Sequence, residues 1–430
     1  MAMVRIRRSL GMAMTALCAG ALAVTAASAG ISAASTKSHH STATTSPSTV
    51  PAPSGQVPLQ YAATYQRLSA QLNTYGAAVN AMPDYRSRGS SAPRFVAAAE
   101  LLDANGNQQG KLLEPGAMSA VERELTALKN LGVRGVTIGI KLPLLLSRYT
   151  PLASKYANFY AAVAKQARAR GFTIDVELGG LFCGTVFSTC SYAYPRTIAG
   201  WATLTAEQAR IVIARVHPNY LDILAEPNTE AELTSIGALG TLSGVVQFVT
   251  ATLAQIGARG TTKIGAGAAS WFPVSWDRAI SKTSVNVLIE HIYPLSPAIV
   301  QTITATAALA HQTHKPLVAD EVWLYKSTPS LTGGVTASGD EAKSDAYSFF
   351  EPLDEKFLSI TRQWSTKADV AFTSAFWSEQ LFTYVVWTPQ LEAGSPTQTL
   401  AVLNEQTVGA WANGTYSASG LTWAGRVRKR

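Results

Sequence analysis

Short apolar segments alternate with longer amphipathic stretches along most of this chain. The apolar segments are rich in β-branched residues, as buried parallel strands are. The stretches between them repeat apolar residues every three or four positions, which is typical of helices that cover a sheet. Several helical stretches end in glycine, a common C-cap. The predicted strands lie at 95–102, 133–141, 172–180, 220–226, 262–269, 285–293, 316–323 and 370–377.

Eight strand–helix units in sequence predict an α/β fold, the (β/α)8 or TIM barrel. We expect one barrel domain at 94–425, with its last helix at about 396–412. An open doubly wound sheet is the main alternative. Such a sheet usually has fewer strands, and no GxGxxG loop follows the first predicted strand.

The N-terminal 29 residues have the composition of a secretory signal peptide. Arg5, Arg7 and Arg8 precede an apolar run at 10–26, which ends in the small residues 27–29. A membrane anchor is the alternative, but the run is weakly hydrophobic and short for a span of ~20 residues. We therefore expect the protein to be secreted, either extracellular or associated with the cell envelope, with no membrane segment after cleavage.

Two further segments precede the predicted barrel. Residues 30–57 are rich in Ser, Thr and Pro and poor in large apolar residues, so we expect a disordered linker. Residues 58–93 are expected to form an N-terminal helical extension, with a helix at about 59–82.

The formal net charge of +8 comes mainly from the two ends of the chain. Without the three signal-peptide arginines it is +5, and without the four basic residues of the tail at 426–430 it is +1. A nucleic-acid-binding domain normally carries a basic stripe on its folded part. We therefore expect no nucleic-acid partner, and we expect a monomer.

The chain has three cysteines, and Cys18 falls within the predicted signal peptide. The other two, Cys183 and Cys190, are seven residues apart in a Gly/Ser/Thr-rich stretch. In an exported protein such a pair predicts a loop disulfide. A metal site would need further ligands nearby, and the next histidine is His217. We therefore expect no metal and no cofactor.

Two glutamates stand at the ends of predicted strands, where barrel active sites lie. Glu226 ends the fourth strand and Glu321 lies near the end of the seventh. Two facing carboxylates can cleave a glycosidic bond, one as the proton donor and the other as the nucleophile or base. The alternatives are that Glu226 opens a helix before Pro227, and that Glu321 forms a structural salt bridge.

Asp320 competes with Glu321 for the catalytic position. Successive residues of a strand face opposite sides of the sheet. If Leu317, Ala319 and Glu321 face the barrel interior, Asp320 faces the helices. We therefore choose Glu321 on the basis of this alternation.

These strand ends resemble those of the clan A retaining glycoside hydrolases, which include cellulases, mannanases and galactanases. Glu226-Pro227 resembles the acid/base motif of strand four, often Asn-Glu-Pro, and Glu321 occupies the position of the strand-seven nucleophile. His291 and Tyr293 resemble the strand-six His-x-Tyr motif, and Trp377 the strand-eight tryptophan of the sugar subsite. The resemblance covers about 94–412. It implies that Tyr293 and His291 support the two glutamates.

The chain departs from this pattern at Ala225, where most of the clan has an asparagine that contacts the sugar 2-hydroxyl. We expect Asn228 or Glu177 to replace that contact. Further polar residues at strand ends are Glu100, Asp175 and Lys141, and we expect the lysine to pair with a neighbouring acid. Trp271, Trp276, Trp323 and Trp377 lie at or just after strand ends. They can stack on sugars or fill the core, and we favour stacking.

Together these features predict a secreted retaining glycoside hydrolase that cleaves β-linked polysaccharide or oligosaccharide. An inactive carbohydrate-binding barrel is the alternative that Ala225 supports. A barrel enzyme of other chemistry, such as a lyase, is a third.

Overall fold

The computed structural model of the chain describes residues 48–49, 56–86, 95–185, 187–293, 295–326 and 343–426. The predicted signal peptide, most of the predicted linker and the end of the basic tail lie outside these residues. From Pro47 onward the chain forms one compact unit.

Eight parallel strands close into a barrel in sequence order, from β2 to β9. β9 pairs with β2 to complete it, with Phe372 opposite Val96. This confirms the predicted (β/α)8 barrel, and each predicted strand contains one of those observed. They are β2 (Val96–Glu100), β3 (Gly135–Gly139), β4 (Thr173–Glu177), β5 (Tyr220–Asp222), β6 (Lys263–Gly267), β7 (Val287–Ile292), β8 (Leu317–Val322) and β9 (Phe372–Ala375).

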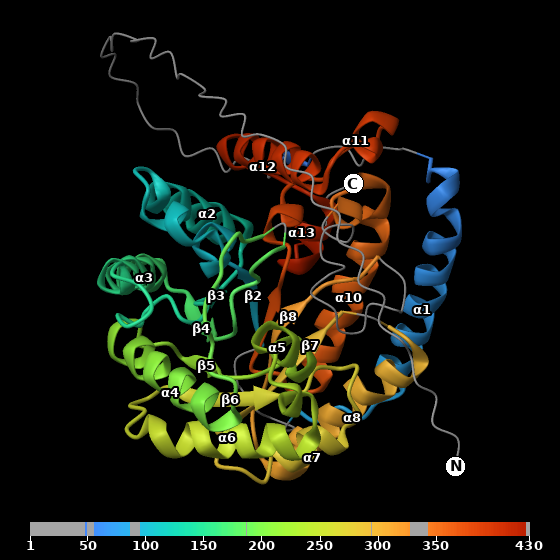
Figure 1. Ribbon diagram of the computed structural model, residues 1–430. Coiled ribbons are helices and arrows are strands. Elements are labelled where there is room, and N and C mark those ends of the chain that lie inside the picture. Colours follow the sequence, from blue (N-terminus) through green and yellow to red (C-terminus); the bar gives the residue numbers. More distant parts are fainter. Residues whose placement is uncertain are drawn as a thin grey trace, which may run out of the picture. The chain divides into compact units, whose positions relative to one another are not determined.

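Helices surround the strands (Figure 1). The longer ones are α2 (Ala117–Leu131), α3 (Ala153–Ala169), α4 (Ile198–Arg215), α6 (Leu242–Ile256), α8 (Pro297–Thr313) and α10 (Glu351–Lys367). Shorter ones are α5 (Pro227–Thr234), α7 (Ser275–Ile280), α11 (Pro389–Ala393) and α13 (Ala418–Trp423). The predicted final helix is α12 (Pro396–Asn413). In the parts of the chain that the structure describes, no helix is both long and apolar enough to cross a membrane.

The predicted N-terminal helix is also present, as α1 (Ala62–Ala81). Its buried residues are Leu68, Leu72, Tyr75 and Val79, spaced by three or four positions. This face packs against α8 and α10, which lie beside it in Figure 1. The ammonium of Lys367 donates a 2.9 Å hydrogen bond to the carbonyl of Val79 near the end of the helix.

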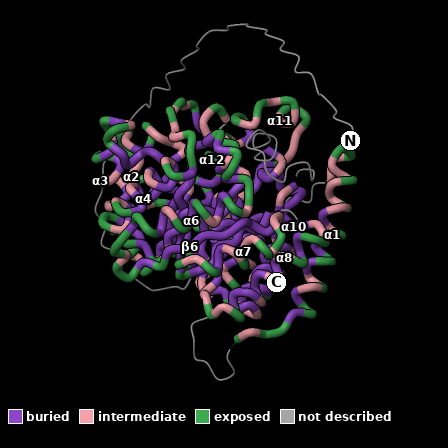
Figure 2. Tube along the Cα trace, turned by 60° about the horizontal axis from the view of Figure 1, so that its bottom comes forward, coloured by how far each residue is buried: buried purple, intermediate pink, exposed green. Residues whose placement is uncertain are grey.

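Alternate residues of the strands fill the barrel interior. The rings of Tyr220 in β5 and Phe372 in β9 lie 5.8 Å apart, although these strands are not neighbours. Val287, Ile289 and Val318 belong to the same interior cluster. The strands and the helix faces toward them are buried, while exposed residues lie on the outer faces of the helices (Figure 2).

The predicted alternation in β8 is wrong. Leu317 and Ala319 belong to the large hydrophobic cluster that includes the helices, while Val318 faces the interior. The pairing of β8 with β9 shifts register between Ala319 and Val322. This irregularity breaks strict alternation, and both Asp320 and Glu321 contact the same histidine, His291.

Cys183 and Cys190 form the predicted disulfide, in the loop after β4, with their Cα atoms 4.8 Å apart. The loop approaches the end of the barrel that carries the two glutamates, because the ring of Phe187 lies 6.4 Å from that of Trp377. The disulfide therefore fixes a loop beside the predicted sugar subsite.

Candidate active site

The two predicted catalytic glutamates come together at the carboxyl ends of β5 and β8. Glu226 is the N-cap of α5, with Pro227 in the first turn. Its side chain does not cap the helix, but accepts a 2.6 Å hydrogen bond from Thr229 Oγ1. Glu321 Oε2 accepts a hydrogen bond from the Tyr293 hydroxyl. A carboxylate oxygen of each glutamate lies within 4.8 Å of the other.

His291 at the end of β7 lies between these carboxylates. Its Nδ1 is 2.9 Å from Glu226 Oε1 and 3.4 Å from Glu321 Oε2. Its Nε2 is 3.3 Å from Asp320 Oδ1. Burial opposes a charge on the ring, but the carboxylates of Glu321, Asp320 and Glu226 outweigh it and raise the pKa of His291 well above its usual value.

The two glutamates differ in their exposure. The Glu226 side chain is 21% exposed, whereas that of Glu321 is 10% exposed. Burial, together with the nearby carboxylates of Glu177 and Glu226, raises the pKa of Glu321 well above that of an ordinary glutamate. His291 and Lys141 oppose this rise. The pair therefore consists of one accessible carboxyl group and one enclosed carboxyl group.

Lys141, just beyond β3, provides a buried cation beside this pair. Its Nζ lies 2.7 Å from Glu177 Oε1, which confirms the expected pairing with a neighbouring acid. Burial alone would raise the pKa of Glu177, but the charges of Lys141 and His291 outweigh it and the pKa is lowered. Burial also opposes the charge of Lys141, but the carboxylates of Glu177 and Glu321 raise its pKa overall. Glu177 is therefore held as a carboxylate close to Glu321.

Three of the predicted tryptophans have different surroundings. Trp271 is half-buried, and its Nε1 donates a 3.0 Å hydrogen bond to Asn228 Oδ1. The Nε1 of Trp377 donates a 3.0 Å hydrogen bond to Asp345 Oδ2. Trp323 has no exposed surface, so the prediction that it lines a sugar subsite is wrong. Core packing encloses its indole, with Lys326 Nζ 5.5 Å from the ring centre.

Sequence reasoning missed several neighbours of Tyr293. Its ring packs 5.9 Å from that of Phe376 and 5.5 Å from that of Tyr325. Phe376 directly follows β9 and Tyr325 lies three residues after β8, and these positions near strand ends were the available signal. Asp222 at the end of β5 was also missed, although a carboxylate on an interior-facing position of a strand needs a partner.

His291 belongs to two sets of three side chains whose oxygen and nitrogen atoms are close enough together to surround a cation. One set adds Asp222 and Asp320, the other Glu226 and Glu321, and in each set the atoms lie within 4.8 Å of one another. Each ring nitrogen already faces a carboxylate at 2.9 to 3.4 Å. We therefore assign these contacts as ion pairs of an imidazolium.

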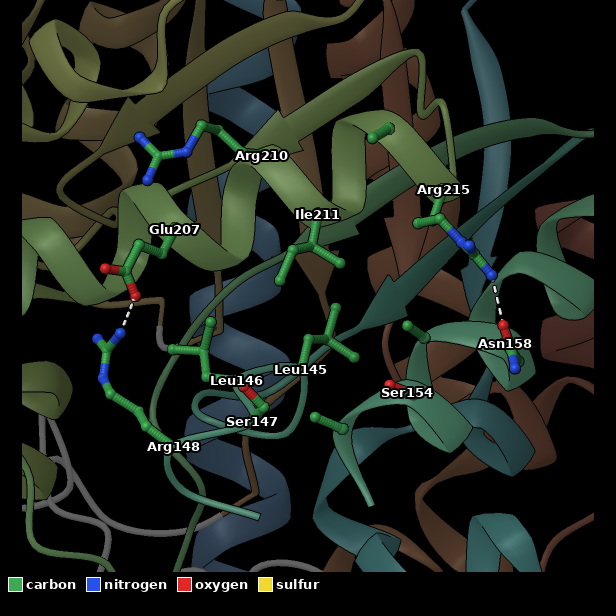
Figure 3. A pocket seen from close by; sticks show the side chains of 13 residues that line it. Leu145, Leu146, Ser147, Arg148, Ser154, Asn158, Glu207, Arg210, Ile211 and Arg215 are labelled. Atoms are coloured by element: carbon green, nitrogen blue, oxygen red, sulfur yellow. Dashed lines mark hydrogen bonds and ion pairs between the residues drawn. The ribbon is translucent and has the colours of Figure 1, made fainter. Parts of the chain in front are cut away.

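A separate groove of about 660 Å³ lies between α3, α4 and the segment after β3 (Figure 3). Leucines and alanines form part of its lining, and an Arg148–Glu207 ion pair lies at its edge. Arg215 donates to Asn158 at the opposite side (Figure 3). None of the predicted catalytic residues lines this groove.

No family model matches this chain, and no curated protein matches it. Similar solved structures include the exo-β-1,4-mannosidase Op5Man5 from Opitutaceae bacterium strain TAV5, at 12% identity and a TM-score of 0.46, covering 75% of this chain and 62% of that one. GH5_18 from Streptomyces cattleya in complex with Manβ1-4GlcNAc is 14% identical, with a TM-score of 0.44 and coverage of 78% and 80%. The Ignisphaera aggregans GH53 catalytic domain is 13% identical, with a TM-score of 0.43 and coverage of 77% and 96%.

Proposed function

We propose that this protein is a retaining glycoside hydrolase with Glu226 as acid/base and Glu321 as nucleophile. The observation that carries the proposal is that one carboxylate oxygen of each glutamate lies within 4.8 Å of the other. Retaining glycosidases need catalytic carboxyl groups about 5–5.5 Å apart, whereas inverting enzymes leave ~6.5–9.5 Å for a water molecule. The short separation favours double displacement.

The surroundings of each glutamate suit its proposed role. Glu226 is the more exposed of the two and can protonate the leaving oxygen of a bound glycoside. Glu321 attacks the anomeric carbon and forms a glycosyl ester, with the Tyr293 hydroxyl orienting its Oε2. Glu226 then removes a proton from the water that hydrolyses the ester. This regenerates both groups.

Ala225 leaves the chain without the asparagine expected before the acid/base. We propose that the amide of Asn228 replaces it. Trp271 holds Asn228 Oδ1, and Asn228 Nδ2 is buried without a hydrogen-bond partner among the described residues. A donor in this state can bind a sugar hydroxyl, because leaving it unpaired is costly.

Covalent trapping tests the mechanism directly. We would treat the protein with a panel of 2,4-dinitrophenyl 2-deoxy-2-fluoro-β-glycosides and map the labelled peptide by mass spectrometry. The expected result is one sugar attached at Glu321. Glu321→Gln should lose labelling and turnover while keeping its melting temperature. The control Glu290→Gln should retain labelling and turnover, because Glu290 lies on the other face of β7, near Thr306 of α8. Unlabelled protein that also fails to hydrolyse the non-fluorinated glycosides would reject the proposal.

Ala225 also favours a second candidate, an inactive carbohydrate-binding barrel. That function predicts binding of β-glycans in titration calorimetry without any turnover. It further predicts that Glu226→Gln and Glu321→Gln leave the affinity within about threefold.

We also propose that the protein is exported by the signal peptide at 1–29. N-terminal sequencing of protein recovered from culture medium should begin at Gly30. Recovery of the uncleaved N-terminus in the membrane fraction would instead support the anchor.

A further inference from the structure

Asp320 and Glu321 are consecutive in β8, yet both contact one imidazole. Regular alternation would place their side chains on opposite faces of the sheet. The register shift between Ala319 and Val322 changes this arrangement. Asp320 Oδ1 lies 3.3 Å from His291 Nε2, and Glu321 Oε2 lies 3.4 Å from His291 Nδ1.

From this geometry we infer that Asp320 is a positioning residue, which holds His291 as an imidazolium with its Nδ1–H directed at Glu226. The inference rests on the proposed function for its role in turnover. It assigns the buried Asp320, which has no exposed surface, to the catalytic apparatus.

The partners of the ring determine its protonation. Glu226 Oε1 lies at hydrogen-bond distance from Nδ1, and Asp320 Oδ1 lies 3.3 Å from Nε2 as an ion-pair contact. An ionised carboxylate has no hydrogen to donate to either nitrogen. Both nitrogens therefore need a hydrogen, which is the imidazolium form. When Glu226 carries the proton that it delivers, Nδ1–H still faces the carboxylate of Glu321, whose Oε2 lies 3.4 Å away, so each nitrogen keeps a carboxylate neighbour.

The acids near the ring favour this form. They come from four strands and the segments that follow them: Glu177, Asp222, Glu226, Glu290, Asp320 and Glu321. The buried cation Lys141 opposes it, but its ammonium is paired with Glu177 at 2.7 Å. The attraction of the acids overcomes the burial of the ring and raises the pKa of His291.

In the proposed reaction, the imidazolium acts when Glu226 loses its proton. The proton passes to the leaving oxygen as the glycosidic bond breaks, and Glu226 becomes a carboxylate. His291 Nδ1–H then stabilises that carboxylate by a charge-assisted hydrogen bond. In the second half, Glu226 regains a proton from the attacking water. His291 keeps both of its hydrogens throughout.

Nitrogen NMR tests the protonation state without requiring activity. The protein with 15N-labelled histidine has six such residues, and the signals of His291 are assigned by comparison with His291→Gln. We expect both His291 nitrogens to stay protonated from pH 5 to pH 8. A neutral ring at pH 7 in the unmodified protein would overturn the inference, whether or not any variant folds.

Asp320→Asn removes the charge but keeps the shape. The loss of the negative charge beside Nε2 should lower the pKa of His291, so one of its nitrogens should lose its hydrogen at a lower pH than in the unmodified protein. The carboxylate of Glu226 then loses a cationic neighbour, so the basic limb of kcat/KM should move to higher pH. We also expect kcat/KM to fall about 10- to 100-fold, the size of the loss when the outer partner of a metal-binding histidine is removed.

Asp175→Asn is the matched control. Asp175 is an equally buried aspartate, on β4, and none of its described contacts is to His291. Both the NMR signature and the basic limb should stay in place in this variant. A similar change in both variants would show a general effect of buried charge and overturn the inference.

Two further outcomes separate the hypotheses. Stoichiometric divalent metal found by elemental analysis, and lost in Asp320→Asn, would overturn the inference in favour of an ion between Asp222, His291 and Asp320. If the NMR result is as expected but no glycoside labels the protein, the proposed function fails and the assignment of the imidazolium stands.

Discussion

Lys141 Nζ lies 2.7 Å from Glu177 Oε1, with 4% of the lysine side chain and 11% of the glutamate side chain exposed. Removing one partner of a buried pair leaves an uncompensated charge. We therefore expect Lys141→Met to lower the free energy of unfolding by about 3–5 kcal/mol, measured by urea denaturation. The exposed Lys155→Met should change it by less than about 0.5 kcal/mol. A Lys141→Met/Glu177→Leu double variant that recovers no stability would argue against the pairing as the cause.

Asp345 fixes the orientation of Trp377 through the hydrogen bond to its indole. Asp345→Leu should loosen the ring and weaken substrate binding by about 0.5–1.5 kcal/mol, roughly threefold to tenfold in KM, with little change in kcat. Steady-state kinetics on a glycoside that the protein hydrolyses would measure this. Asp345 Oδ1 also lies 3.4 Å from Lys326 Nζ. Asp354→Asn is the control, because Asp354 pairs with the same lysine and bonds to Tyr384 rather than to the indole. Equal effects on KM in the two variants would point to Lys326 rather than Trp377.

The acidic limb of the pH–rate profile should report Glu321. The proposed nucleophile must be ionised to attack, and burial together with Glu177 raises the pKa of this carboxyl. Activity should therefore be lost as the pH falls through a value above the usual ~4.3 of glutamate. Glu177→Gln removes a negative neighbour, so the pKa of Glu321 should fall and the acidic limb of kcat/KM should move to lower pH. An unmoved limb would show that another group titrates there.

Glu100 at the end of β2 makes stability depend on pH. Burial, and next the charge of Glu177, raise its pKa to about 8. Its contribution to the free energy of unfolding is complete below the pKa that Glu100 has in the unfolded chain. As the pH rises from that pKa to the pKa in the folded protein, the contribution is lost at about 1.4 kcal/mol per pH unit. Glu100→Gln has no such loss and still offers an oxygen to Asn105. The melting temperature of the variant relative to the unmodified protein should therefore rise between pH 5 and pH 8.

The repeating pattern of the chain was enough to predict the barrel. Burial on both faces makes each strand a nearly continuous apolar run, so this signal is local. A parallel barrel also places the ends of all its strands at one rim. Glu226, Tyr293 and Glu321 could therefore be assigned to one site from their positions alone. The loop disulfide was predictable for a similar reason, since Cys183 and Cys190 are close in sequence.

The tertiary structure decided which side chains meet. The sequence did not show which alternate residues of β8 face the interior, so it wrongly placed Leu317 and Ala319 there and Asp320 on the helix side. It also contains no local sign of the register shift that brings Glu321 to the same histidine. It also could not show that packing encloses Trp323 while Trp271 remains half-buried, because exposure depends on neighbours far along the chain. The composition of the strands determined the barrel and the presence of two glutamates at its rim. Pairing between strands determined that the imidazole of His291 contacts both glutamates and Asp320. A shift of a single residue in this pairing reverses which face of the sheet a side chain occupies.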